Sequence, residues 1–182
     1  MTKKHRLLPA PRRTFSPVSA VLSGALAGAV GTAVFDAVNY VMYRAQGGEG
    51  GFVAWDFSAG LDSWDGAPAP AQVGKRLGEA VLARELPGSS ARMVNNLTHW
   101  GYGMAWGAQY GLVAGSARAA KVRTGPVFGA VVWLSGYVVL PIMKLYQPIW
   151  EYDAKSLAMD LAPHLVYGTT TAATFATLDR RR

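Results

Sequence analysis

Four long apolar runs, separated by charged connections, constrain the fold of this chain most. They cover residues 18–43, 93–115, 125–145 and 156–178. Each contains about the 20 residues that an α-helix needs to cross a hydrocarbon core of about 30 Å. Only 16% of the 182 residues are charged, against about a quarter in ordinary soluble domains. We therefore expect an all-α integral membrane protein, a bundle of four transmembrane helices.

Small residues recur at every fourth position in three of these runs, a spacing that lets transmembrane helices approach closely. The rows are Ala20, Gly24, Gly28 and Thr32, then Gly103, Gly107, Gly111 and Gly115, then Gly168, Ala172 and Ala176. We expect their glycines to form helix-packing faces.

Polar side chains extend these rows toward one end of the bundle: Asp36, Asn95, His99, Asp160 and His164. At a rise of about 1.5 Å per residue, the four ionisable groups lie roughly 6–12 Å inside the outer ends of their spans. A carboxylate inside a span costs about 2.5–3.5 kcal/mol on insertion scales. The sequence therefore predicts a polar site in the outer leaflet.

Several chemistries fit this set of side chains. Imidazoles titrate near neutral pH and suit proton transfer, or binding of an ion or a small ligand. Imidazole and carboxylate also suit a divalent metal, with His99, His164 and Asp160 as ligands. A purely structural alternative is Asp–His pairing between helices, or capping of helix ends by Asp160 and Asn95.

Catalytic signatures are absent from the sequence. The chain has no cysteine, which excludes thiolate nucleophiles and thiolate metal sites. It also has no G-x-S-x-G, H-E-x-x-H or Walker motif. The sequence thus favours a non-enzymatic membrane protein without a cofactor, unless a divalent metal binds. An accessory subunit that binds other membrane helices and a metal-dependent membrane enzyme are the alternatives.

The connection over residues 44–92 is too long for a simple turn. Its aromatic side chains, such as Trp55 and Trp64, suit a membrane interface. Residues 71–86 have apolar side chains at helical spacing. We expect a short amphipathic helix there, lying on the membrane or acting as a lid.

Basic residues are concentrated on one side of the predicted membrane. The arm over residues 1–17 has five lysines and arginines, the connection over 116–124 three and the tail over 179–182 three, with a single acidic residue among them. The positive-inside rule then places both termini in the cytoplasm. This distribution accounts for the net charge of +7 without nucleic acid as a partner. Expected partners are the lipid bilayer, a second copy of the chain or another membrane protein.

Several short motifs occur together: G-A-L-A-G at 24–28, N-x-x-x-H-W-G-Y-G at 95–103 and P-H-L-V-Y-G at 163–168. With the long connection, they make the chain resemble the YagU-like group of small bacterial inner-membrane proteins of unknown function. The resemblance implies a bacterial inner-membrane location and a link with acid stress, and it implies no defined chemistry.

Overall fold

The computed structural model describes residues 16–116 and 122–180, which contain helices and no strand. Residues 1–15 of the predicted basic arm, 117–121 of the basic connection and 181–182 of the tail lie outside the described residues.

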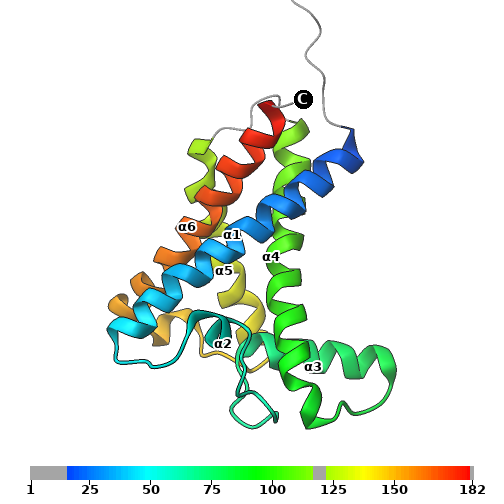
Figure 1. Cartoon of the computed structure of the whole chain (residues 1–182), viewed down its shortest axis with the longest axis vertical. Coiled ribbons are helices and arrows are strands. Elements are labelled where there is room, and N and C mark those ends of the chain that lie inside the picture. The colour runs from blue at the N-terminus through cyan, green and yellow to red at the C-terminus, as the bar shows by residue number, and fades with distance from the viewer. Residues whose placement is uncertain (1–15, 117–121, 181–182) are drawn as a thin grey trace, which may run out of the picture.

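Four long helices make up most of the described chain: α1 (Pro17–Ala45), α4 (Ala91–Ser116), α5 (Gly125–Ile142) and α6 (Ala154–Arg180). Helix α1 packs against both α4 and α6, and α5 packs against α6. The start of α1 and the end of α6 lie at one end of the bundle (Figure 1). The short helices α2 (Phe52–Asp56) and α3 (Ala69–Leu82) lie at the opposite end.

Single turns of 3-10 helix, η1 (Gly88–Ser90), η2 (Val122–Thr124) and η3 (Ile149–Glu151), stand in the connections. Helices α3 and α5 end earlier than predicted, because a residue with left-handed backbone geometry follows each of them. Helix α5 ends at Ile142, just after Pro141, and Lys144 takes a left-handed φ of 55°. Helix α3 covers 69–82 rather than 71–86, because Ala83 leaves the helix with a φ of 51°. The predicted loop after the first span contains α2, a helix that its glycine-rich sequence did not indicate.

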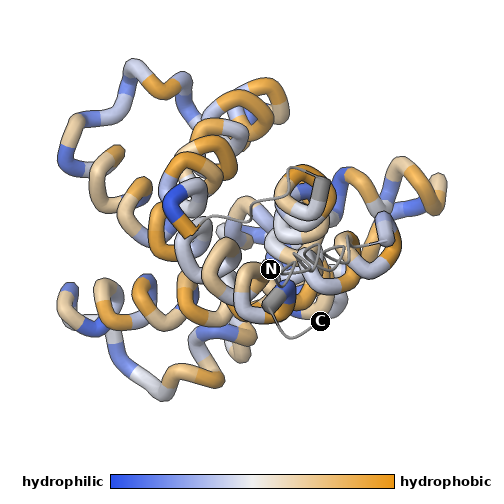
Figure 2. Tube along the Cα trace, turned by 90° about the horizontal axis from the view of Figure 1, so that it is seen from above, coloured by the Kyte–Doolittle hydropathy of each residue, from blue (hydrophilic) through white to orange (hydrophobic). Residues whose placement is uncertain are grey.

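Two of the helical segments, Pro17–Ala45 and Val122–Ile142, are long and apolar enough to cross a membrane. Helices α4 and α6 are of similar length but include more polar residues, such as Gln109 and Thr169. Figure 2 shows apolar stretches along the helices and hydrophilic stretches in the connections.

Glycines bring the backbones of α1 and α4 into contact. A Cβ atom on Gly28 would lie 2.9 Å from the Cα of Gly107, and one on Gly24 would lie 2.9 Å from the Cα of Gly111. These distances are shorter than the ~3.5–4.0 Å of a relaxed carbon–carbon contact. Only glycine therefore fits at this crossing.

A second glycine contact joins α5 to α6. A Cβ on Gly168 would lie 2.7 Å from the Cα of Gly129, and one on Gly125 would lie 2.6 Å from the Cα of Thr169. The small buried core beside these contacts comprises Ala27, Tyr110, Ala114, Ala172 and Phe175. Two close helix pairs, joined through α1 and α6, thus hold the polar side chains in place.

Candidate functional site: a cavity with two histidines

Asp36 of α1 and His99 of α4 form a hydrogen-bonded pair inside the bundle. The Nε2 atom of His99 lies 2.9 Å from one carboxylate oxygen of Asp36 and 3.0 Å from the other. Asp36 is buried, with 4% of its surface exposed. Because a carboxylate accepts hydrogen bonds, Nε2 carries the proton and donates. The Nδ1 atom of His99 has no hydrogen bond within the described part of the chain.

The end of α2 brings a second carboxyl group, that of Asp56, next to Asp36. Burial and the neighbouring Asp36 raise the pKa of Asp56 from 3.8 to about 6. Asn95 of α4 is buried beside this segment, and its amide donates to the Ser58 hydroxyl at 3.0 Å. Asn95 thus lies in the second turn of α4, away from the helix cap, and holds Ser58, two residues after Asp56.

Asp160 and His164, one turn apart on α6, form the second polar pair. The Oδ2 atom of Asp160 accepts hydrogen bonds from Trp133 Nε1 and from the Tyr137 hydroxyl, both at 3.0 Å. Both donors lie on α5. Asp160 is six residues into α6, so it does not cap the helix. Instead, the backbone N–H of Ser156 donates to the side chain of Asp153.

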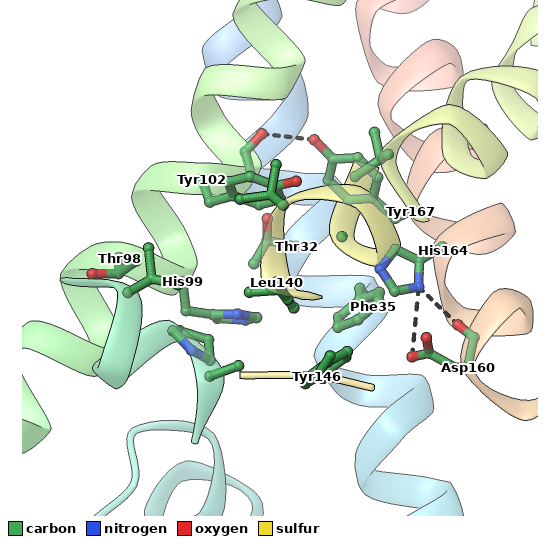
Figure 3. A pocket seen from close by; sticks show the side chains of 17 residues that line it. Thr32, Phe35, Thr98, His99, Tyr102, Leu140, Tyr146, Asp160, His164 and Tyr167 are labelled. Atoms are coloured by element: carbon green, nitrogen blue, oxygen red, sulfur yellow. Dashed lines mark hydrogen bonds and ion pairs between the residues drawn. The ribbon is translucent and has the colours of Figure 1, made fainter. Parts of the chain in front are cut away.

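The hydrogen bond of His164 shows which of its ring nitrogens carries a proton. Nδ1 lies 2.7 Å from the backbone carbonyl oxygen of Asp160. A carbonyl oxygen only accepts, so Nδ1 donates and carries a proton. In the neutral ring, Nε2 then has a free lone pair. Figure 3 shows this second nitrogen on the side of the ring that faces the cavity.

Both imidazoles line one cavity of about 300 Å³. Its walls come from α1, α4, α5 and α6, and Tyr146 and the first turns of α3 also line it. The walls are mostly apolar, with the rings of Phe35, Tyr102 and Tyr167 among them. This volume is at the lower end of the ~300–1,000 Å³ typical of small-molecule sites.

The predicted ionisable residues therefore lie as two pairs, one on each side of the cavity. Phe35 stands between the imidazoles, with its ring centroid 6.2 Å from that of His99 and 4.9 Å from that of His164 (Figure 3). Asp36 and Asn95 are not among the residues that line the cavity. Within residues 16–116 and 122–180, no group of three or more His, Cys, Asp or Glu side chains can hold a metal ion. The described residues thus provide no set of three ligands for the divalent metal that the sequence left open as an alternative.

Three residues at these pairs were missed from the sequence: Asp56, Trp133 and Tyr137. Asp56 stands in a glycine-rich segment whose path no periodicity indicates. Trp133 and Tyr137 are four residues apart on α5, the spacing of neighbours on one helix face. That spacing in an otherwise apolar run was a usable signal for two hydrogen-bond donors directed at one acceptor.

The described residues form an all-α fold in which two helical segments are long and apolar enough to span a membrane. Residues 70–173 match the profile of the DUF1440 family, whose description is a protein of unknown function, and the chain belongs to this family. The match includes His99, Asp160 and His164 and leaves out α1 with Asp36. No curated protein and no solved structure matches the chain.

Proposed function

We propose that this chain is a four-span membrane protein of the bacterial inner membrane that binds a small ligand in the cavity lined by His99 and His164. One observation supports this above all. Both imidazoles line the same cavity, each has one nitrogen bonded within the protein, and each has another nitrogen without a hydrogen bond among the described residues. Such side chains have a fixed orientation and are available to a ligand.

The exposed surface supports a membrane location. In the most apolar 18-residue stretch of each candidate span, only 39% (α1) and 22% (α5) is buried, whereas the core helix of a soluble protein is mostly buried. Large apolar side chains such as Leu22, Val113 and Val127 are exposed on α1, α4 and α5. Helices α4 and α6, at about 1.5 Å per residue, are also long enough to cross a core of about 30 Å.

Helix α3 fits an interfacial position in this arrangement. Leu77, Val81 and Leu82 are exposed on it, at 59%, 83% and 51%, which suits a helix lying at the lipid surface. Its first turns line the cavity through Ala69 and Val73. Helix α3 therefore serves as the lid at that end.

The four-span topology, with both termini in the cytoplasm, rests on the charge distribution. It also rests on the alternating direction of the long helices (Figure 1). A membrane-impermeant thiol reagent tests it, because the chain has no cysteine of its own. In intact cells, Ser89→Cys before α4 should react, and Arg123→Cys after α4 should react only once the cells are opened. Equal reaction of both variants in intact cells would show that α4 does not cross the membrane.

Ligand binding is tested at Gly136, which lines the cavity and has nothing within 4 Å of an added Cβ. We would reconstitute the Gly136→Cys variant in lipid nanodiscs and follow its reaction with methyl methanethiosulfonate by mass spectrometry. The probes are benzylammonium, benzyl alcohol and ethylbenzene, which have the same shape. Gly101→Cys is the matched control, because Gly101 is on α4, is equally open and does not line the cavity.

At least one probe should slow modification of Gly136→Cys and leave Gly101→Cys unaffected. Adding His164→Ala should weaken that protection several-fold. If none of the three probes protects Gly136→Cys, the proposed binding function is wrong.

The resemblance to the YagU-like group adds a narrower proposal, a role under acid stress. Among the described groups, the raised pKa of Asp56 supports it, because this carboxyl changes charge near pH 6.

A further inference from the structure

The hydrogen-bond donors around the cavity are largely engaged within the protein. The Thr32 hydroxyl donates to the Gly28 carbonyl, and the Tyr167 hydroxyl donates to the Gly103 carbonyl. The two imidazole N–H groups donate to Asp36 and to the backbone of Asp160, as described above.

Tyr102 follows the same pattern. Its hydroxyl lies 2.8 Å from the Ser135 hydroxyl. Ser135 has one proton and uses it on the Val132 carbonyl at 2.6 Å, so Tyr102 donates to Ser135. The donors of five lining residues, Thr32, His99, Tyr102, His164 and Tyr167, are therefore all used inside the bundle.

The hydroxyls of Thr98 and Tyr146, which also line the cavity, have no hydrogen bond among the described residues and can donate or accept. The other atoms left for a ligand are acceptors. They include the lone pairs of His99 Nδ1 and His164 Nε2 in the neutral rings. The carboxylate of Asp160 adds another acceptor, because Trp133 and Tyr137 both donate to Oδ2. Oδ1 lies 4.0 Å from His164 Nδ1, beyond hydrogen-bond distance, and has no hydrogen bond in the part of the chain that the structure describes. A ligand that satisfies these atoms must itself donate.

The charges around the cavity favour the same kind of ligand. No lysine or arginine is among the described residues that line it. The guanidinium of Arg76 on α3 donates a hydrogen bond to the Met143 carbonyl at the end of α5 and so is engaged within the protein. Three carboxyl groups, those of Asp36, Asp56 and Asp160, stand around two imidazoles. With all three ionised, the site has a negative net charge even when both rings are protonated.

We propose that the ligand is an organic ammonium ion, a protonated amine attached to an apolar or aromatic body. Its N–H groups donate to Asp160 Oδ1 and to His164 Nε2. Its body lies against Phe35 and the apolar side chains of α5, where aromatic faces also attract a cation. This inference rests on the proposed function, since it names the chemical class that the same cavity binds.

The probes of the protection assay separate the ligand classes, because benzylammonium, benzyl alcohol and ethylbenzene differ only in a terminal –NH₃⁺, –OH or –CH₃ group. We would run them at pH 8 against Gly136→Cys, and subtract probe uptake into empty nanodiscs. Benzylammonium should protect at a concentration about tenfold or more below that of benzyl alcohol, because a hydrogen bond to a charged group is about twice as strong as a neutral one. Ethylbenzene should protect least.

The role of the Asp160 carboxylate is tested by combining Asp160→Asn with Gly136→Cys. Asparagine keeps the shape of the aspartate side chain and removes its charge. The preference for benzylammonium over benzyl alcohol should then fall about tenfold, while protection by ethylbenzene stays the same. If benzyl alcohol or ethylbenzene protects as well as benzylammonium, the ligand is not an ammonium ion, although the cavity still binds small molecules. A preference that survives Asp160→Asn also overturns the inference. Failure of all three probes contradicts the binding function itself.

Discussion

The contact between α1 and α4 gives a quantitative prediction for Gly107→Ala. An added Cβ would lie 2.5 Å from the Cα of Gly28 and 2.7 Å from its backbone nitrogen. A relaxed contact needs about 3.5–4.0 Å, so the helices must separate by about 1 Å. The carbonyl oxygen of Gly24 lies closer still, so all three obstructing atoms are backbone and no side chain can rotate away. Overpacking of this kind costs about 1–3 kcal/mol.

Thermal unfolding in a mild detergent, followed by tryptophan fluorescence, measures this cost. For a chain of this size, about 1–3 kcal/mol lowers the midpoint by about 2–12 °C. Gly101→Ala is the matched control, because Gly101 is on the same helix and an added Cβ meets nothing within 4 Å. That variant should stay within about 1 kcal/mol of the wild type.

The double variant Gly28→Ala/Gly107→Ala adds a further check. Once one alanine has separated the helices, the second meets less obstruction, so the two costs should sum to more than the cost of the double variant. The reasoning is refuted if Gly107→Ala unfolds at or above the midpoint of Gly101→Ala, because backbone contact at this crossing would then not exist.

Two further changes test the polar groups. Asp56→Asn should stabilise the protein at pH 7.5 by about 1 kcal/mol. Raising the pKa from 3.8 to about 6 corresponds to about 3 kcal/mol, and solvent screening reduces this because the side chain is partly exposed. The folded state binds this proton more tightly, so stability is present below pH 4 and is lost as the pH rises to about 6; a gain over the wild type that is the same at pH 4 and pH 7.5 contradicts this. Tyr167→Phe should cost about 1 kcal/mol in unfolding free energy, since its hydroxyl donates to the buried Gly103 carbonyl at 2.6 Å; an unchanged midpoint would show that this bond contributes nothing.

The sequence predicted the helices well because their physical signals are local. Apolar runs and four-residue spacing identify a helix and its small face, and each predicted run falls almost entirely within a helix. Glycines 24, 28, 103, 107, 111 and 168 all lie at contacts between helices. The four-span topology remains a prediction, because polar residues in α4 and α6 leave two segments, among the described residues, that meet the criteria of length and composition.

The arrangement of the candidate site could be predicted only in part from the sequence. Depth along each helix indicated that His99 and His164 lie at similar levels, but not that Phe35 stands between them. Rotation about a helix axis decides which side chains meet, and a spacing of four drifts by about 40° per step on a helix with 3.6 residues per turn. The position of Asp56 depends on the path of a loop, which periodicity does not encode.

The two glycine contacts also determine how the bundle can deform. Backbone lies directly on backbone between α1 and α4 and between α5 and α6, so neither pair can slide or shear without collision. Helices α4 and α5, in contrast, meet through side chains, such as Tyr102 with Ser135 and Trp106 with Phe128. The softest mode of the bundle is therefore a breathing motion that moves α4 away from α5. Such a motion widens the cavity from its side and leaves both rigid pairs intact.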